Sequence, residues 1–418
     1  MNRMEQFDAL VDRRHTNSYK WEDIPVADSI KEEIIPLWVA DMDFKTAPIV
    51  RAAVEKRAAH GIFGYSSVPH AYYEAIQKWF RNRYNWNIQK DWIQYTTGVV
   101  PAISCVLKAL TMPGDKVLVT TPVYNCFFSS IRNNGCEVLT SPLRLKHGKY
   151  VIDFDDFESK CADSKTVAFV LCNPHNPGGR VWTREELTSI SEICKRHGVV
   201  VVSDEIHNEL VRRGNKYIPY ASVNDAALHG SVICCSPSKS FNTAGLQIAN
   251  IICVDPAVRR RIDRAININE VCDVNPFAID ATIAAYTTEG AAWLDSLNHY
   301  IDENDQVLNN FFENLNRSVS SLVTGNSEIP VFKCMPLEAT YLAWVNCAPL
   351  CKYLCVSVEE LCTLLLQEAK VYLSSGTCYG TDGEGYLRIN MACPRSVLKD
   401  ALRRIADFVQ KKCGATAF

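Results

Sequence analysis

The sequence predicts an α/β fold with a mostly parallel sheet, and two observations support that prediction. The first is a set of short apolar runs, rich in Val and bounded by Gly, Pro, Asp or Ser, at 117–120, 166–174, 198–205 and 231–239. Residues that are apolar at successive positions are typical of strands buried on both faces, as in a parallel sheet. The second is a helix-like segment that separates two of these runs, as a strand–helix–strand unit requires.

That helix-like segment is TREELTSISEICKRHG, at 183–198. Thr183 and Glu186 match a capping box at its start, and Gly198 stands where a helix C-cap is expected. Repetition of this pattern along the middle of the chain indicates helices that alternate with parallel strands.

The two ends of the chain differ from its middle. The first 45 residues are irregular and aromatic, whereas the chain after about 290 predicts a long amphipathic helix, two strand-like segments and a final helix near 396–412. We therefore expect a large domain at 46–288 and a smaller α+β domain built from 1–45 together with 289–418.

The composition is that of an ordinary globular protein. Lys and Arg number 44 against 47 Asp and Glu. No basic tract predicts a nucleic-acid partner, and no acidic tail predicts a solvating arm. No apolar run is long enough to span a membrane, and the charged N-terminus lacks the apolar core of a secretory signal. The 18 cysteines form no C-x-x-C pair and no zinc-like spacing, so we expect no metal site and a reduced, cytoplasmic protein.

Polar motifs follow several strand-like segments, where open α/β sheets bind their ligands. In TTGVVPAIS, Gly98 precedes an apolar helix that we expect to start with Pro101, a favoured first helical residue. The free amide groups of such a helix N-terminus bind phosphate, although an ordinary helix start has the same pattern. In NPHNPGGR, a rigid turn presents Asn176 to a ligand oxygen, and a plain Pro-Gly turn is the alternative.

Charged residues stand at the ends of the apolar runs at 198–205 and 231–239. Asp204 follows four valines, and a buried carboxylate there needs a partner such as a protonated ring nitrogen, unless it is simply a helix N-cap. Lys239 follows an apolar run in SPSKSF. A desolvated lysine is a nucleophilic amine, whereas a solvated loop lysine is not, and Ser236 and Ser238 beside it can donate hydrogen bonds to a phosphate.

Together, the order of these motifs resembles the fold-type I, class I and II aminotransferase superfamily of pyridoxal-phosphate enzymes, over nearly the whole chain. The order is a glycine turn, Asn-Pro-x-Asn-Pro-Gly, an Asp after a valine strand, Ser-x-Ser-Lys and a late Arg. The resemblance implies a large domain with a mostly parallel sheet, a smaller α+β domain, and pyridoxal 5′-phosphate held as a Schiff base on Lys239.

The resemblance also assigns roles to individual residues. Asp204 would pair with the pyridinium nitrogen, Asn176 would donate to the ring hydroxyl oxygen, and Tyr124 in TTPVYNCF would stack on the ring. The late arginine, Arg388 in GYLRINMACPR, matches the residue that clamps the substrate α-carboxylate, a task that suits a bidentate guanidinium. Residues expected to hold the cofactor phosphate are Gly98, Val99, Val100, Ser236 and Ser238.

Finer motifs are similar to the cystathionine β-lyase, or C–S lyase, branch of the MalY/PatB type. They are PLWVADMDF, GYSSVPHAYYEAI, SDEIHNELV and SPSKSFNTAGL. This branch implies substrate contacts from Trp38, Val39 and Ala40. It also implies a homodimer with shared sites, in which Tyr65 reaches the phosphate of the neighbouring subunit's cofactor.

Three positions depart from the common superfamily pattern. Gln247 stands where many members have an arginine, and His207, a cofactor contact by this resemblance, stands where tyrosine is frequent. Both fit the lyase branch. The third is Asn346, at the end of ATYLAWVN, where an acidic residue is expected.

The reaction implied is β-elimination, in which Lys239 removes the α-proton and a thiolate leaves the β-carbon. L-Cystathionine or another cysteine S-conjugate would then give pyruvate, ammonia and a thiol. An aminotransferase shares the early steps and is the first alternative. The second alternative is a lyase-fold protein with a regulatory binding role, which need not carry a lysine-bound cofactor.

Overall fold

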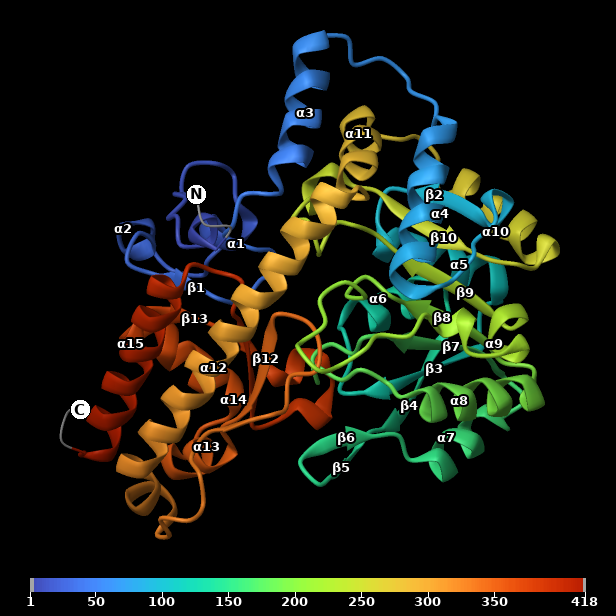
Figure 1. Ribbon diagram of the computed structural model, residues 1–418. Coiled ribbons are helices and arrows are strands. Elements are labelled where there is room, and N and C mark those ends of the chain that lie inside the picture. The colour runs from blue at the N-terminus through green and yellow to red at the C-terminus, as the bar shows by residue number, and fades with distance from the viewer. Residues whose placement is uncertain (1–3, 416–418) are drawn as a thin grey trace. The chain divides into compact units, whose positions relative to one another are not determined.

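The computed structural model describes residues 4–415, and the chain divides into two compact units. The large unit comprises Thr46–His175 and Arg180–Asp295. The small unit comprises Met1–Lys45, Asn176–Gly179 and Ser296–Phe418. Each unit has its own sheet, and both are shown in Figure 1.

The large unit is built on a seven-stranded sheet in the order β2-β10-β9-β8-β7-β3-β4. Neighbouring strands from β9 through β8, β7 and β3 to β4 pair in parallel, and β10 is antiparallel to both of its neighbours. The predicted mostly parallel sheet is thus confirmed, with each of the four Val-rich runs supplying one strand. The strands are β2 Ile93–Thr96, β3 Lys116–Thr121, β4 Glu137–Pro142, β7 Thr166–Cys172, β8 Val200–Asp204, β9 Ser231–Cys235 and β10 Ala249–Ile252.

Helices cover both faces of this sheet. Ala168 and Val170 of β7 pack in one apolar cluster with residues of α5 and α10, whereas Phe169 between them contacts Phe157 of α7, with ring centroids 4.9 Å apart. Successive strand residues point to opposite faces, so α5 and α7 lie on opposite sides of the sheet. The helices are α3 Pro48–His60, α4 His70–Tyr84, α5 Val99–Leu110, α6 Cys126–Asn133, α7 Phe154–Cys161, α8 Arg184–His197, α9 Asp225–His229, α10 Pro256–Ile268 and α11 Pro276–Ala285.

Helix α8 shows how the sequence sets its own boundaries. The side chain of Thr183 accepts a hydrogen bond from the backbone N–H of Glu186, and the Glu186 carboxylate accepts one from the backbone N–H of Thr183. Gly198 ends the helix at φ 70°, a left-handed conformation that favours glycine. The capping box and C-cap predicted from the sequence are both present.

The small unit contains a four-stranded antiparallel sheet in the order β11-β12-β15-β14, and a two-stranded pairing of β1 with β13. Helix α12 begins in the large unit and continues into the small one. The strands are β1 Ile35–Pro36, β11 Lys333–Cys334, β12 Leu342–Asn346, β13 Val371–Tyr372, β14 Ser374–Ser375 and β15 Tyr386–Asn390. The helices are α1 Tyr19–Glu22, α2 Asp28–Lys31, α12 Thr288–Thr324, α13 Ala348–Leu354, α14 Val358–Leu364 and α15 Arg395–Cys413.

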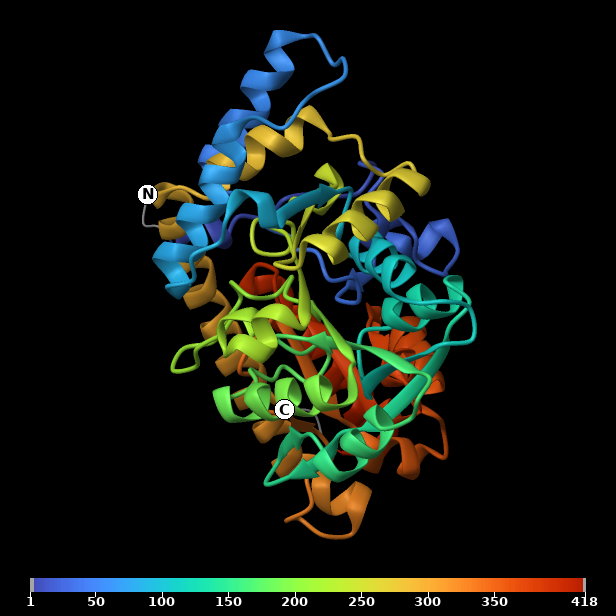
Figure 2. The same cartoon turned by 90° about the vertical axis from the view of Figure 1, so that its right-hand side faces the viewer.

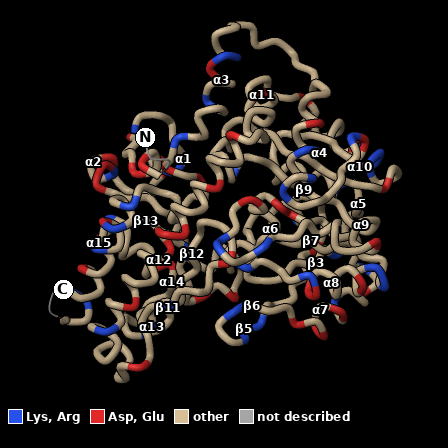
Figure 3. The backbone as a smooth tube through the Cα atoms, in the orientation of Figure 1, with Lys and Arg blue, Asp and Glu red and all other residues tan. Residues whose placement is uncertain are grey.

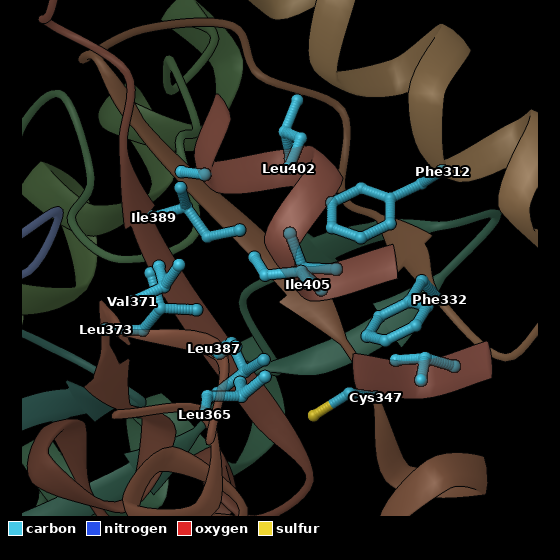
Figure 4. Packing of buried hydrophobic residues seen from close by; sticks show 14 of the residues in the cluster. Phe312, Phe332, Cys347, Leu365, Val371, Leu373, Leu387, Ile389, Leu402 and Ile405 are labelled. Atoms are coloured by element: carbon cyan, nitrogen blue, oxygen red, sulfur yellow. The ribbon is translucent and has the colours of Figure 1, made fainter. Parts of the chain in front are cut away.

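The core of the small unit lies between its sheet and helices α12 and α15. Figure 4 shows Leu387 and Ile389 of β15 pointing toward Ile405 of α15. Phe312 of α12 stacks on Phe332, with ring centroids 4.8 Å apart. This packing fixes β15 and therefore the backbone that carries Arg388.

The distribution of charged residues and cysteines is that of an ordinary globular protein. Figure 3 shows Lys and Arg interspersed with Asp and Glu along both units. No helix within residues 4–415 is long and apolar enough to cross a membrane. The 18 cysteines are all free thiols, and over the same residues no three His, Cys, Asp or Glu side chains cluster as metal ligands would.

The spacing of four residues between Cys347, Cys351 and Cys355 would place all three on one face of a single helix. Helix α13 covers only part of that stretch, so Cys347 and Cys355 cap its two ends and Cys351 lies within it. The sulfur atoms of Cys347 and Cys351 are 4.0 Å apart, and Cys355 is exposed.

Candidate active site

Chemically active side chains gather at one edge of the large sheet. Asp204 is the last residue of β8, and Lys239 lies just beyond β9, the neighbouring parallel strand. Tyr124 follows β3, and His207 lies in the turn after β8. Because the carboxyl ends of parallel strands meet at the same edge, these residues share the position at which open α/β sheets bind ligands.

Asp204 is a buried carboxylate with an unusual protonation equilibrium. Its side chain is about 4% exposed, and Oδ1 accepts a hydrogen bond from the backbone N–H of Ile206 at 3.1 Å. Burial raises its pKa to about 7, against the opposing effects of that hydrogen bond and of the nearby Lys239 ammonium. A carboxylate in such surroundings favours a cationic partner, and a protonated ring nitrogen has the required charge.

Lys239 is half-buried in a tight turn between β9 and β10. Ser236 donates its hydroxyl hydrogen to the carbonyl of Ile248 at 2.6 Å and accepts from the backbone N–H of Ser238 at 3.1 Å. The Ser236 hydroxyl therefore stabilises the turn that presents Lys239. Ser238 is half-buried at the same turn.

Helix α5 begins at Val99, so the predicted start at Pro101 is two residues too late. The N-terminus of α5 has the properties of a phosphate site. The first intrahelical bond runs from the N–H of Ala102 to the carbonyl of Gly98 at 2.9 Å, so the amides of Val99 and Val100 have no partner within the helix. Gly98 is extended, at φ 164°, and a Cβ there would meet its nearest neighbour, a Pro101 side-chain atom, at an ordinary 3.5 Å. The protein's own packing does not demand glycine at this place, which leaves close approach of a ligand as a reason for it.

Tyr124 and His207 flank the same edge. Tyr124 is half-buried, and its ring meets Phe127 edge-on at 5.8 Å. His207 is about 3% exposed. Gln247 is exposed at the end of the short turn after Lys239, in a left-handed conformation at φ 54°.

Arg388 occupies β15 in the small unit and is about 5% exposed. Its Nη2 donates to the carbonyl of Trp38 at 2.7 Å, its Nη1 lies 3.4 Å from Oδ1 of Asn176, and its guanidinium lies 4.8 Å from the ring centroid of Tyr379. The Nε of Arg388 has no hydrogen-bond partner, and within residues 4–415 no carboxylate pairs with this arginine. A buried guanidinium without a counter-ion favours binding of an anion.

Asn176 and the 38–40 segment belong to the same unit as Arg388. Asn176 is about 3% exposed, and because its Oδ1 faces Arg388, its amide nitrogen is the donating end. Trp38 donates from its indole nitrogen to the carbonyl of Lys20 at 3.0 Å and packs against Tyr372 at 4.8 Å. Val39 and Ala40 continue this chain segment, both half-buried.

Tyr65 is a surface residue of the large unit. It belongs to the 61–69 segment between α3 and α4, which arcs along the outer margin of the large unit in Figures 1 and 2. Its side chain is fully exposed, and the neighbouring Ile62 and Phe63 are about 69% and 58% exposed. Exposed apolar residues in such number mark a surface for protein association.

Asn346 has a structural role. Its Oδ1 accepts a hydrogen bond from the backbone N–H of Ala348 at 3.2 Å, where α13 begins. This contact gives a reason for a short amide at the end of β12.

One buried acid was not singled out from the sequence. Glu205, next to Asp204, is fully buried and accepts hydrogen bonds from the hydroxyl of Tyr217, the backbone N–H of Tyr220 at 2.9 Å and the hydroxyl of Ser203 at 2.9 Å. Asn173 donates to the same carboxylate at 3.2 Å. Burial raises the pKa of Glu205 to about 7. The sequence could have indicated this residue, because Glu205 directly follows Asp204 in SDEIH. A second carboxylate at a buried strand end also needs hydrogen-bond partners.

Comparison with known proteins covers almost all of the chain. Residues 32–405 match the model of the family described as aminotransferase class I and II. Cystathionine beta-lyase PatB of Bacillus subtilis (strain 168) is 40% identical over 96% of this chain and 98% of that protein.

Solved structures are similar over the same extent. Cystalysin from Treponema denticola, whose structure contains pyridoxal 5′-phosphate, superposes with a TM-score of 0.88 at 31% identity, over 97% of this chain and 99% of that one. A PLP-bound C–S lyase from Staphylococcus hominis gives a TM-score of 0.85 at 32% identity over the same shares.

Proposed function

Since the chain belongs to the class I and II aminotransferase family, we propose that it is a pyridoxal 5′-phosphate-dependent C–S β-lyase. It cleaves L-cystathionine or another cysteine S-conjugate to pyruvate, ammonia and a thiol. The observation that carries this proposal is the 40% identity to a cystathionine β-lyase over nearly the full length of both chains.

The residues of the large unit fit the cofactor. Lys239 supplies the amine for covalent attachment, and Asp204 supplies the buried carboxylate that favours a protonated ring nitrogen. The amides of Val99 and Val100, the open approach at Gly98 and the hydroxyl of Ser238 are suited to the phosphate. Ser236 acts there through the turn that it stabilises.

Further contacts complete the assignment. Tyr124 offers an aromatic face for ring stacking, Asn176 an amide donor for the ring hydroxyl oxygen, and His207 a buried imidazole beside Asp204. When bound, pyridoxal phosphate supplies the electron sink for a carbanion at the substrate α-carbon.

The chain's own residues then perform the reaction. Arg388 binds the substrate α-carboxylate with its unpaired Nε and its Nη groups, beside Trp38, Val39 and Ala40. Lys239, once the substrate amine has replaced it, takes the α-proton onto Nζ. The Cβ–S bond breaks, sulfur leaves with the electron pair as a thiolate, and the released aminoacrylate hydrolyses to pyruvate and ammonia.

The enzyme is proposed to act as a homodimer in the cytoplasm. The exposed Ile62, Phe63 and Tyr65 provide a surface for a second copy, and Tyr65 would reach the phosphate in that copy. The 18 free thiols are consistent with a reducing compartment.

Product analysis tests the reaction. Purified holoenzyme is incubated with L-cystathionine and free cofactor, with no keto acid. Pyruvate, ammonia and homocysteine should accumulate over many turnovers. An aminotransferase, the second function that this family membership supports, would stop after about one equivalent and resume only when a keto acid is added.

A further inference from the structure

The segment formed by residues 38–42 has neither helix nor strand, yet side chains hold all of its backbone carbonyls. Each of the five accepts a side-chain hydrogen bond, and the donors come from distant parts of the small unit. They are Arg388 (2.7 Å) and Ser374 (3.0 Å) to Trp38, Asn390 to Val39 (2.6 Å) and Asp41 (2.6 Å), Tyr341 to Ala40 (2.9 Å), Lys20 to Asp41 (3.3 Å), and Arg13 to Met42 (3.1 Å).

This arrangement makes the position of the 38–42 segment depend on individual side chains. In a strand, the carbonyls would be paired by a neighbouring backbone, and removal of one side chain would leave the ladder intact. Here the loss of Asn390, Tyr341 or Arg13 leaves one carbonyl without its side-chain partner. The carbonyls of Trp38 and Asp41 each have two donors, so loss of one of these frees the segment to shift.

Among the charged donors, Lys20 is the most buried. Its side chain is 0% exposed, and its Nζ lies 2.7 Å from Oδ2 of Asp43, which is about 4% exposed. The other oxygen of Asp43 accepts from Nη1 of Arg13 at 2.8 Å and from the indole nitrogen of Trp21 at 2.9 Å. Although burial alone would raise it, the pKa of Asp43 is lowered, chiefly by the Lys20 ammonium.

These contacts connect Lys20 to Arg388 by two physical links. Lys20 anchors the Asp41–Asp43 end of the segment through a buried ion pair and a carbonyl bond. At the other end, the Trp38 carbonyl accepts from Nη2 of Arg388. Breaking a buried pair by removing one partner is costly, because the remaining charge stays buried.

We propose that Lys20 is a positioning residue for recognition of the substrate α-carboxylate. It fixes the 38–42 segment through Asp43, and the Trp38 carbonyl of that segment orients the Arg388 guanidinium. The inference rests on the proposed function in one respect, namely that Arg388 binds the carboxylate of an amino acid.

The test measures binding to the holoenzyme with two small probes. α-Methylalanine carries an amine and a carboxylate but no α-hydrogen, so it undergoes neither elimination nor transamination. Isopropylamine has the same carbon frame without the carboxylate. Each is titrated against the absorbance of the bound cofactor. In Lys20→Met, the Kd of α-methylalanine should rise about tenfold, while that of isopropylamine stays within about twofold.

A double-mutant cycle tests whether Lys20 acts through Arg388. In an Arg388→Lys background, Lys20→Met should have little further effect on the Kd of α-methylalanine, since both changes disable the same contact. Additive effects would overturn the proposal. So would equal weakening of both probes, because that is the result of a merely structural role.

Two more variants distinguish a specific effect on binding from a general loss of stability. Val319→Ala trims the small-unit core at α12, and it should lower the Tm without changing either Kd. If Lys20→Met fails to fold, Arg13→Gln replaces it, because Arg13 is partly exposed and bonds to Met42, Asp41 and Asp43. Arg13→Gln should then show the selective loss for α-methylalanine, and an unchanged ratio of the two Kd values would overturn the proposal.

The same design separates this inference from the proposed function. Neither probe has a β-leaving group, so the titrations report carboxylate recognition whether the enzyme is a lyase or an aminotransferase. With L-cystathionine, Lys20→Met should raise KM about tenfold and leave kcat nearly unchanged. If wild-type enzyme fails to cleave L-cystathionine but the probe cycle behaves as expected, the lyase assignment fails and the positioning role stands.

Discussion

Nη2 of Arg388 lies 2.7 Å from the carbonyl oxygen of Trp38, a residue 350 positions earlier in the chain. The carbonyl is a neutral acceptor, so it orients the guanidinium without cancelling its charge. The 3.4 Å contact with Oδ1 of Asn176 is neutral as well. A site that fixes an arginine with uncharged groups keeps its full charge for an anionic ligand.

Replacing Arg388 by lysine should therefore weaken substrate binding. An ammonium keeps the charge but loses the planar pair of donors, and the expected rise in KM for L-cystathionine is roughly ten- to hundredfold. Steady-state kinetics measure it. Arg395→Lys is the matched control, because Arg395 pairs with Glu303 in the same unit at 2.6 Å and should leave KM unchanged. A normal KM in Arg388→Lys would contradict the carboxylate role.

Lys239 should be the residue that carries the cofactor. Lys239→Ala removes the attachment point and the base together, so turnover should be abolished. Borohydride reduction of wild-type holoenzyme, followed by peptide mapping, should find the pyridoxyl group on Lys239. The exposed Lys216 serves as control, since Lys216→Ala should retain activity and labelling. A label on any other lysine would refute the assignment.

Asp204→Asn should preserve the fold and slow removal of the α-proton. The amide has the shape of the carboxylate but no charge, so it no longer favours a protonated ring nitrogen, and loss of such electrostatic support costs roughly a hundredfold or more. Exchange of the substrate α-hydrogen in deuterium oxide measures this step before any C–S cleavage. Exchange at the wild-type rate would exclude the pyridinium-partner role.

These residues show what the sequence can reveal. Asp204 and Lys239 were singled out from the sequence because a charged side chain just after an apolar run is unusual. The structure places both at the same edge of the sheet, as the pairing of parallel strands predicts. The mostly parallel sheet followed from the same Val-rich runs, and the structure confirms it. Local periodicity is a property of neighbouring residues, so it can be seen without coordinates.

Other features depend on contacts between residues far apart in the chain. The Lys20–Asp43 ion pair joins residues 23 positions apart in an irregular region. Such a region has no helical or strand periodicity from which side-chain contacts could be predicted. Ser236 illustrates a second difficulty. The sequence indicates a hydroxyl near a phosphate site, but only the structure shows that this hydroxyl donates to the carbonyl of Ile248.

The buried Glu205 should make stability depend on pH. Its pKa is raised from 4.5 to about 7, so the folded state keeps a proton that the unfolded state has lost. The contribution of protonated Glu205 to the free energy of unfolding is fully present below pH 4.5 and is lost as the pH rises through 7. In Glu205→Gln the group does not titrate, so stability relative to wild type should improve between these limits by on the order of a few kcal/mol.

Urea unfolding of the cofactor-free protein at several pH values measures this difference. Glu192→Gln is the control, because Glu192 is exposed on α8. Its stability should run parallel to that of wild type from pH 4.5 to 8. A parallel course for Glu205→Gln as well would show that Glu205 is ionised in the folded protein throughout this range.

The last prediction concerns Tyr65, which is fully exposed in the single chain. If it binds the cofactor phosphate of a second copy, a hybrid dimer of Tyr65→Phe and Lys239→Ala subunits has one complete site, which contains Lys239 from one chain and Tyr65 from the other. Random mixing makes half of the dimers hybrid, so about a quarter of wild-type activity should return in the mixture and about half in isolated hybrids.

Mixing itself must be shown not to restore activity. Lys239→Ala combined with Asp204→Asn provides that control, because both residues lie at the same sheet edge of one chain and every site in the hybrid lacks one of them. Mixtures are prepared by unfolding and refolding together, and hybrids are isolated through two different affinity tags. Activity in the Tyr65 hybrid but not in the control hybrid is expected. Equal, background activity in both would mean that Tyr65 does not complete the partner's site, and the shared-site proposal would fail.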